Sequence, residues 1–382
     1  MKVVRIYPKT NFHTFLHSDT LWGNLIYAYR MLYGVKETSK LISKYLSEEP
    51  PFVVSSFFPL KMNKKNYSVT YFLPKPISCS KHRDALNPEE MAYMKEYKKV
   101  RYIDKETFEE FLKGNYDDNL LFERFYKWKK AEDELRNLID NHLDRPDKNQ
   151  ELKNTIKSNK FNYIRSLNPT FNLHNSIDRM GNSTLKSEGR GQLYWEEEFE
   201  SFGNVMKEKK VEYNVMYKKQ SNEGDEDDFT VNGVYFLVEG KESNLINGPL
   251  NLLSHIGLGG NKSIGKGSFS FEIEEFSFHQ PPNYNAFVSL SLFHPNAEDI
   301  EKLKSNRHSS FYDITTRIGK VGRDFNLVFN EKNPVICFTE GSSFFVKELL
   351  KGHIVPTAQY DGENKIYSNY LFFGVKANLR LQ

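Results

Sequence analysis

Glycines and lysines are concentrated in the stretch GLGGNKSIGKGSF, which runs from Gly257 to Phe269. Glycine has no Cβ, so such a backbone can adopt positive φ values and bring its N–H groups directly against an anion. Lys262 and Lys266 add positive charge to the same stretch. The pattern therefore predicts a loop that contacts phosphate groups.

The loop departs from the nucleotide-binding P-loop at one decisive position. Gly260, Gly265 and Lys266 have nearly the P-loop spacing, but Gly267 stands where that motif needs a Ser or Thr to bind magnesium. The flanks are also reversed, because a predicted helix precedes the loop and a predicted strand follows it. We interpret the loop as a binding site for a polynucleotide backbone rather than for a nucleotide. The alternative is a glycine-rich connector packed closely on its neighbours.

The elements around the loop predict a ferredoxin-like α+β domain in residues 1–278. A strand at 3–7 precedes a helix that is expected to be capped by Ser18 and to end at Gly34. The strands that follow are expected at 52–60, 67–73 and 233–238, and a helix at 250–256 and a strand at 268–276 flank the glycine loop. This order is the split βαβ plan of ferredoxin-like folds, once two insertions are set aside.

The two insertions have different characters. Residues 87–160 are helical in pattern, with N-cap signals at Asn87 and Asp104 and a long charged helix expected from Asp118. Residues 170–200 predict a protruding β-hairpin, or thumb, with a Gly/Ser-rich tip. A second α+β domain is expected at 284–382, also ferredoxin-like (RRM-like), with a strand from Ala286 and a helix from Ala297.

Composition restricts the class of protein. The chain has 382 residues, and its 53 Lys and Arg nearly cancel its 50 Asp and Glu, so any nucleic-acid surface must be local. Its two cysteines, Cys79 and Cys337, are far apart and have no zinc-type spacing, so no metal, disulfide or cofactor is predicted. No apolar run approaches the roughly 18 residues of a membrane span. We expect a soluble cytoplasmic protein.

Several motifs occur together in the order found in one known family. They are HSDTLWGNL at 17–25, SSFFPL at 55–60, YFLPKP at 71–76, HNSIDR at 174–179, GQLYWEEEF at 191–199, the glycine loop, EGSSFF at 340–345 and GHIVP at 352–356. With these motifs the chain resembles the RAMP superfamily of CRISPR proteins, and most strongly the fourth subunit of type III-A (Csm) effector complexes.

The resemblance implies a function in antiviral defence. In that family the subunit is a non-catalytic cap on the repeat-derived 5′ handle of the guide crRNA. It also bridges the large subunit with Palm domains to the first of the backbone RAMP subunits. These two proteins and the crRNA are therefore the expected partners, and no enzymatic activity is expected.

The resemblance also implies an RNA-binding site built from three segments. The loop would contribute backbone N–H groups and side-chain donors. The start of the first helix would lie beside the loop and offer its exposed N–H groups to an anion, and the hairpin would contact a displaced nucleotide. The candidate residues are His17, Ser18, Asp19, His174, Asp178, Arg179, Gly257, Gly259, Gly260, Lys262, Ser263, Gly265, Lys266 and Gly267.

Other interpretations remain open on the sequence. A guide-processing endoribonuclease of the same superfamily would use His17 or His174 as a general acid or base, although no His/Tyr/Lys cluster, GGDD or HD motif accompanies them. The equivalent type III-B subunit would share the thumb and the loop. His17 could simply bond a neighbouring loop, and the EGS motif at 340–342 could be a tight turn.

Overall fold

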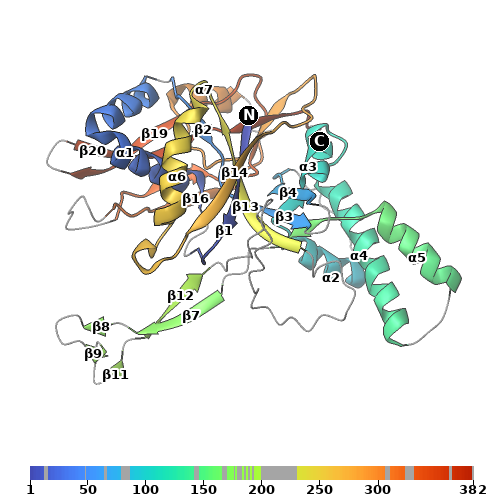
Figure 1. Cartoon of the computed structure of the whole chain (residues 1–382). Coiled ribbons are helices and arrows are strands. Elements are labelled where there is room, and N and C mark those ends of the chain that lie inside the picture. The colour runs from blue at the N-terminus through green and yellow to red at the C-terminus, as the bar shows by residue number, and fades with distance from the viewer. Residues whose placement is uncertain are drawn as a thin grey trace. The chain divides into compact units, whose positions relative to one another are not determined.

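The computed structural model describes most of the chain. The described residues are 1–12, 16–47, 49–63, 67–78, 87–141, 146–165, 230–305, 310–322, 331–360 and 364–380, with the short strands between 170 and 198. They form two compact units, each made of two stretches of chain (Figure 1). One unit contains residues 1–69 and 167–275, and the other contains 70–166 and 276–382.

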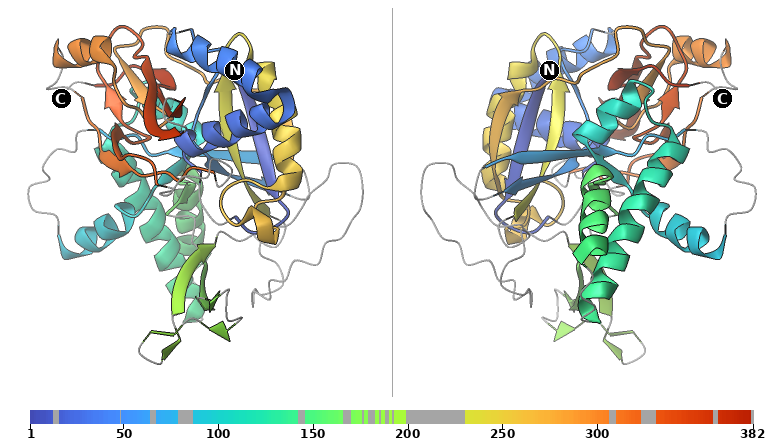
Figure 2. Two further views of the ribbon diagram at one scale, coloured as in Figure 1. Left: turned by 90° about the vertical axis from the view of Figure 1, so that its left-hand side faces the viewer. Right: turned by 90° about the vertical axis from the view of Figure 1, so that its right-hand side faces the viewer.

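The sheet of the first unit has the strand order β14-β1-β13-β3, and every pairing that joins these strands is antiparallel. Its elements are β1 (Lys2–Pro8), α1 (Ser18–Leu46), β2 (Val53–Val54), β3 (Phe58–Asn63), β13 (Thr230–Glu239), α6 (Asn247–Ile256) and β14 (Phe269–Glu275). Helices α1 and α6 lie side by side in both views of Figure 2 and contact each other. This is the βαββαβ order of a ferredoxin-like domain, so the prediction for this part of the chain is confirmed.

Helix α1 packs into the core on both sides of an exposed middle, since Leu41 and Tyr45 in its second half are also buried. Leu21, Leu25 and Ala28 are buried, as the apolar pattern predicts, whereas Leu32 and Tyr33 are exposed. The helix was expected to end at Gly34, which instead interrupts it with a non-helical φ of 82° and ψ of 174° before the helix resumes. Glycine tolerates that left-handed φ, so the chain can turn there without a steric clash.

The strand predicted at 52–60 is split into β2 and β3. Between them, Ser55 takes over part of the pairing, because its Oγ accepts the N–H of Leu237 at 2.9 Å and its own N–H donates to the Leu237 carbonyl. The Ser55 hydroxyl therefore accepts the Leu237 N–H in place of a backbone carbonyl, and the regular pairing with β13 stops for the three residues between β2 and β3.

The predicted hairpin is confirmed in its backbone. Strand β7 (Thr170–Asn175) pairs antiparallel with β12 (Leu193–Glu198), and His174 lies opposite Tyr194. Shorter pairs continue beyond it, namely β8 (Ile177–Asp178) with β9 (Ser183–Thr184), and β10 (Lys186–Ser187) with β11 (Arg190–Gly191).

The second unit begins within β4 and contains the helical insertion. Its first stretch holds β4 (Val69–Pro74), α2 (Pro88–Tyr97), β5 (Tyr102–Asp104), α3 (Lys105–Leu112), α4 (Asp118–Asp140), α5 (Pro146–Ser158) and β6 (Tyr163–Ile164). The predicted N-caps are confirmed, since Asn87 accepts the N–H of Glu90 and Asp104 that of Thr107, both at 2.8 Å. The long helix starts at Asp118 as predicted, capped by the residue before it.

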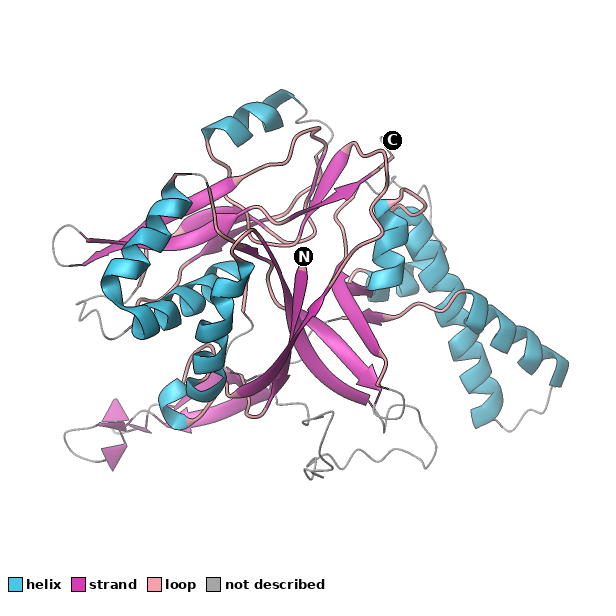
Figure 3. Cartoon of the chain, turned by 45° about the horizontal axis from the view of Figure 1, so that its top comes forward, coloured by secondary structure: helices cyan, strands magenta, loops and turns pink. Residues whose placement is uncertain are grey.

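The second stretch of this unit carries three small sheets among the described residues. Its elements are β15 (Ala286–Ser289), α7 (Ala297–Ser305), β16 (Ile314–Arg317), β17 (Val335–Phe338), β18 (Ser343–Phe344), β19 (Gly352–Tyr360), β20 (Asn364–Leu371) and β21 (Gly374–Ala377). The strand orders are β18-β15-β21, β16-β17 and β19-β20. The described part of the chain contains both helices and antiparallel sheets (Figure 3), which confirms the α+β class. A ferredoxin-like plan for this second part stays a prediction.

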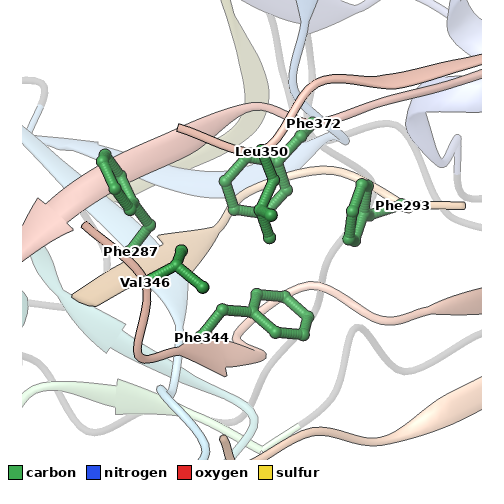
Figure 4. Packing of buried hydrophobic residues seen from close by; sticks show 6 residues of the cluster. All are labelled: Phe287, Phe293, Phe344, Val346, Leu350 and Phe372. Atoms are coloured by element: carbon green, nitrogen blue, oxygen red, sulfur yellow. The ribbon is translucent and has the colours of Figure 1, made fainter. Parts of the chain in front are cut away.

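Aromatic side chains form the core of this second stretch. Phe287, Phe293, Phe344 and Phe372 pack with Val346 and Leu350 in one cluster (Figure 4). The ring centroids of Phe293 and Phe372 are 4.9 Å apart, in the edge-to-face arrangement that aromatic pairs prefer. The high aromatic content of the sequence is used here to fill a core between short strands.

The helical insertion packs with the C-terminal stretch of the chain. The N–H of Asn378 donates to the Leu112 carbonyl at 2.7 Å, and the N–H of Ile77 donates to the Gly341 carbonyl at 2.8 Å. The sequence had assigned residues 87–160 to the first domain by chain order, whereas their contacts group them with residues 276–382. Among the described helices, none is long and apolar enough to cross a membrane.

Candidate nucleic-acid interface

The glycine loop joins α6 to β14. Backbone hydrogen bonds hold its two ends together, and we call these ends, Gly257 and Leu258 with Lys266 and Gly267, the neck of the loop. The N–H of Leu258 donates to the Gly267 carbonyl, and the N–H of Gly267 donates to the Asn11 carbonyl, both at 2.9 Å. Gly267 has a φ of 76°, and a Cβ there would overlap the Leu258 carbonyl oxygen. Gly257 is restricted in the same way by the Lys266 carbonyl. The alternative interpretation of the loop, a connector packed closely on its neighbours, therefore explains the glycines at positions 257 and 267.

The tip of the loop is different from its neck. A short 3-10 turn, η3 (Lys262–Ile264), lies between Asn261 and Gly265, whose φ values are 57° and 83°. A Cβ at Gly265 would meet no atom within 4 Å. Ser263 and Gly265 are exposed, and 67% of Ile264 is accessible to solvent. Close packing therefore does not explain the glycine at the tip, and the backbone there can be reached by a ligand.

Lys262 connects the loop to helix α1. Its Nζ donates to Oδ1 of Asn24 at 2.6 Å and lies 6.0 Å from the centre of the Tyr27 ring. The side chain is half-buried, and this burial lowers the pKa of Lys262. Lys266, the second predicted cation, is also half-buried. The contact with Asn24 places the loop beside the second turn of α1, whereas the prediction named the start of the helix at Ser18 and Asp19.

The start of α1 differs from its prediction by one residue. The N-cap is His17 rather than Ser18, and Ser18 is the first helical residue. The N–H of Ser18 donates to Oγ of Ser56 at 2.9 Å, and both Ser18 and Asp19 are buried. The expectation that the first N–H groups are exposed is therefore wrong for Ser18, because a serine between β2 and β3 already occupies this donor.

Asp19 organises the first turn of the same helix. Its Oδ1 accepts the N–H of Thr20 at 2.6 Å and the Thr20 hydroxyl at 3.1 Å. One turn later, Nδ2 of Asn24 donates to the Thr20 carbonyl at 2.8 Å. A series of polar contacts therefore runs from Asp19 through Thr20 and Asn24 to Lys262 in the glycine loop.

The remaining candidates lie in the hairpin and elsewhere in the loop. His174 is in β7 and Asp178 in β8, where only the backbone is described, and Arg179 lies outside the described residues. Gly259 has a φ of 86°, and Gly260 follows it before the turn at the tip. The structure thus brings His17, Ser18, Asp19 and the loop residues into one unit, together with the backbone of the hairpin.

Sequence reasoning did not select Asn24, although a signal was present. It is a polar residue within the apolar run Leu21–Tyr29, where a helix buried over a wide arc would favour another apolar residue. The EGS motif, in contrast, has the structural role that was left open for it. Gly341 has a φ of 86°, and the N–H of Ser342 donates to the Thr339 carbonyl at 3.3 Å, which closes a tight turn.

Carboxylate, imidazole and thiol groups do not cluster in the part of the chain that the structure describes. No group of three or more His, Cys, Asp or Glu residues in that part is placed to hold a metal ion. Cys337 is buried, and its Sγ donates to the Thr315 carbonyl at 3.6 Å. The groups at the loop are backbone donors and ammonium groups, which are common ligands of phosphate.

Comparison with known proteins relates the C-terminal part of the chain to one family and the whole chain to one fold. Residues 282–376 match the model of the CRISPR Csm4 C-terminal domain. A chain of the Csm3-Csm4 subcomplex of the type III-A CRISPR-Cas interference complex aligns with a TM-score of 0.52 and 20% identity, covering 99% of this chain and 100% of that chain. No curated protein sequence matches.

A second solved structure has the same relation to the chain. A chain of the Csm1-Csm4 cassette in complex with pppApA aligns with a TM-score of 0.51 and 17% identity, covering 100% of this chain and 99% of that chain. At these identities the likeness shows a shared fold. Csm4 is the component common to the two complexes, and it is also the family of the matching C-terminal model, so the resemblance identified from the motifs is confirmed.

Proposed function

We propose that this chain is a Csm4-type subunit that caps the repeat-derived 5′ handle of the guide crRNA in a type III-A effector complex, since residues 282–376 match the Csm4 C-terminal domain. One observation carries this proposal. The contact between Lys262 and Asn24 brings the glycine loop against the first turns of α1, so that two lysines and an accessible backbone turn are gathered in one place.

The chemistry of that place suits the sugar-phosphate backbone of RNA. Lysine ammonium groups and backbone N–H groups are common donors to phosphate oxygens, and they fix the position of a nucleic acid. The chain has a net charge of only +3, so its overall charge does not attract RNA strongly. RNA binding therefore requires a local group of positive charges such as this one. His17 and the hairpin residues His174, Asp178 and Arg179 would contact nucleotides beside it, since displaced bases stack on flat side chains.

The protein neighbours follow from the same family. One solved relative is described with Csm1 and the other with Csm3. We extend this to the present chain and propose that it bridges the large Palm-domain subunit and the first backbone subunit. A bridging cap at one end of a guide needs no reacting groups, and we propose that the chain is not an enzyme and acts in the cytoplasm.

Co-purified RNA tests this function directly. The tagged full-length chain is expressed with its genomic neighbours and purified gently, and the 5′ ends of the bound RNA are sequenced. The expected result is one shared repeat-derived 5′ tag ahead of variable spacers. Complexes without RNA would overturn the proposal, and repeat fragments newly cut by the lone protein would favour the endoribonuclease alternative with His17 or His174.

A further inference from the structure

Lys262 carries a partly buried positive charge whose partners in the described part of the chain are electrically neutral. Its ammonium contacts the amide oxygen of Asn24 and approaches the ring of Tyr27, and neither group is a carboxylate. Burial is the whole cause of the lowered pKa of Lys262, with no acidic residue acting against it. Charges removed from water are ordinarily paired with an opposite charge. This ammonium is therefore suited to receive an anion.

Asn24 is fixed so that it offers oxygen, and not its NH₂ group, to this ammonium. Its Nδ2 donates to the Thr20 carbonyl at 2.8 Å, one helical turn back, and this bond sets the orientation of the amide. Oδ1 then points to Lys262, at 2.6 Å from Nζ. The contact lies in the second turn of α1.

The choice of an amide over a carboxylate at position 24 has a physical consequence. An aspartate has nearly the same shape and would hold the ammonium more strongly, because a charge-assisted bond is about twice as strong as a neutral one. It would also cancel the charge. Asparagine holds the ammonium in place and leaves its charge available, at the small cost of a residue that forms helices poorly.

We propose that Asn24 is a positioning residue of the RNA site, which holds the Lys262 ammonium at the junction of α1 and the glycine loop so that it binds one phosphate of the RNA. This inference rests on the proposed function. In it, Lys262 is the phosphate ligand, and Asn24 acts only through Lys262.

The test uses the effector complex purified through the full-length tagged chain, with Asn24→Asp, Lys262→Ala and the double variant. The guide RNA retained per complex is measured over a series of salt concentrations. A single-stranded phosphate contact contributes about 0.7 to the slope of log affinity against log salt. Asn24→Asp is expected to weaken retention by about fivefold and to make the slope shallower by about 0.7, as Lys262→Ala does.

The double variant separates a positioning role from direct repulsion. If Asn24 acts through Lys262, Asn24→Asp has no further effect on retention or slope once Lys262 is Ala. Asn137→Asp, an exposed change on α4, has the same net charge and is expected to match the wild type. Thermal unfolding of each complex is measured in parallel. Asn24→Asp loses the Nδ2 bond to the Thr20 carbonyl but gains a charge pair with Lys262, so it is expected to unfold close to the wild-type temperature.

Three outcomes would overturn the inference. They are an Asn24→Asp complex with wild-type retention and slope, an Asn24→Asp effect that persists in full when Lys262 is Ala, and a loss of RNA explained by a lower unfolding temperature, in which case Asn24 only supports the fold. Wild-type complexes without any RNA would instead refute the proposed function itself, so the two failures are distinguishable.

Discussion

The buried carboxylate of Asp299 accepts a hydrogen bond of 2.8 Å from the backbone N–H of Gly352. It also accepts the N–H groups of Lys351 at 2.9 Å and Asn296 at 3.1 Å, and so joins the start of α7 to the start of β19. An amide in its place would turn NH₂ towards at least one of these donors. We expect Asp299→Asn to lower the free energy of unfolding by about 3 kcal/mol, measured by denaturant titration.

A charge change elsewhere on α7 provides the control for this prediction. Glu301 is exposed and pairs with Lys304 at 2.7 Å, an ion pair of the kind that contributes little. Glu301→Gln should change the unfolding free energy by less than about 0.5 kcal/mol. Equal effects of the two substitutions would show that Asp299 does not fasten the helix to the strand.

Glu109 on α3 is expected to make stability depend on pH. Its carboxylate accepts the backbone N–H of His279 at 3.0 Å and lies 2.9 Å from Nδ1 of the same residue. Burial alone raises the pKa of Glu109, but these hydrogen bonds and the charge of Lys105 outweigh it and hold the pKa below its ordinary value of 4.5.

The sign of that dependence follows from the lowered pKa. The stabilisation is fully present above pH 4.5, where the carboxylate is ionised in both the folded and the unfolded protein. It is lost as the pH falls through the lower pKa that Glu109 has in the folded protein. Glu109→Gln should therefore cost about 1–2 kcal/mol at pH 7, and the difference from wild type should shrink in acid. Unfolding curves at pH 7 and below pH 4 measure this, and a gap that stays constant would refute it.

Two glycines of the loop are predicted to behave differently when each becomes alanine. At Gly267 the added Cβ would overlap the Leu258 carbonyl, whereas at Gly265 it would meet no atom, although both residues have a positive φ. Gly267→Ala should destabilise the protein by more than about 2 kcal/mol, and Gly265→Ala by about 1 kcal/mol from its φ alone. Thermal unfolding compares them, and equal losses would show that the neck is not the rigid part of the loop.

Features that depend on neighbouring residues were predictable from the sequence. The capping of α2 by Asn87 and of α3 by Asp104 is local chemistry over three residues, and the helix-loop-strand order around the glycine loop follows from apolar periodicity. Contacts across long stretches of chain were not predictable in this way.

The missed contacts share a physical reason. Asn24 and Lys262 are 238 positions apart, and nothing in the pattern near either residue specifies the other. Ser56 occupies the N–H of Ser18 from 38 positions away, which is why the helix start was expected to be open. The grouping of the helical insertion with the C-terminal stretch likewise depends on bonds such as that of Asn378 to Leu112.

His17 distinguishes a cap from an enzyme. In this structure it serves α1 through its backbone, since its carbonyl accepts the N–H groups of Thr20 at 3.1 Å and Leu21 at 2.9 Å and its side chain makes no capping bond. His17→Ala should therefore leave the helix intact and the bound guide at its normal length, read by RNA sequencing. Accumulation of unprocessed precursor would instead identify His17 as a catalytic group.

The two loop lysines together carry the charge on which the proposed RNA site depends. Lys262→Ala with Lys266→Ala removes two ammonium groups, which corresponds to two lost phosphate contacts. Guide retention should therefore fall by about tenfold or more, and the slope of log affinity against log salt should become shallower by about 1.4. Lys98→Ala with Lys99→Ala, two exposed residues after α2, removes the same charge from the other compact unit and should leave retention unchanged. Unchanged RNA occupancy in the loop variant would count against the loop as the RNA site, because backbone N–H groups alone would then suffice.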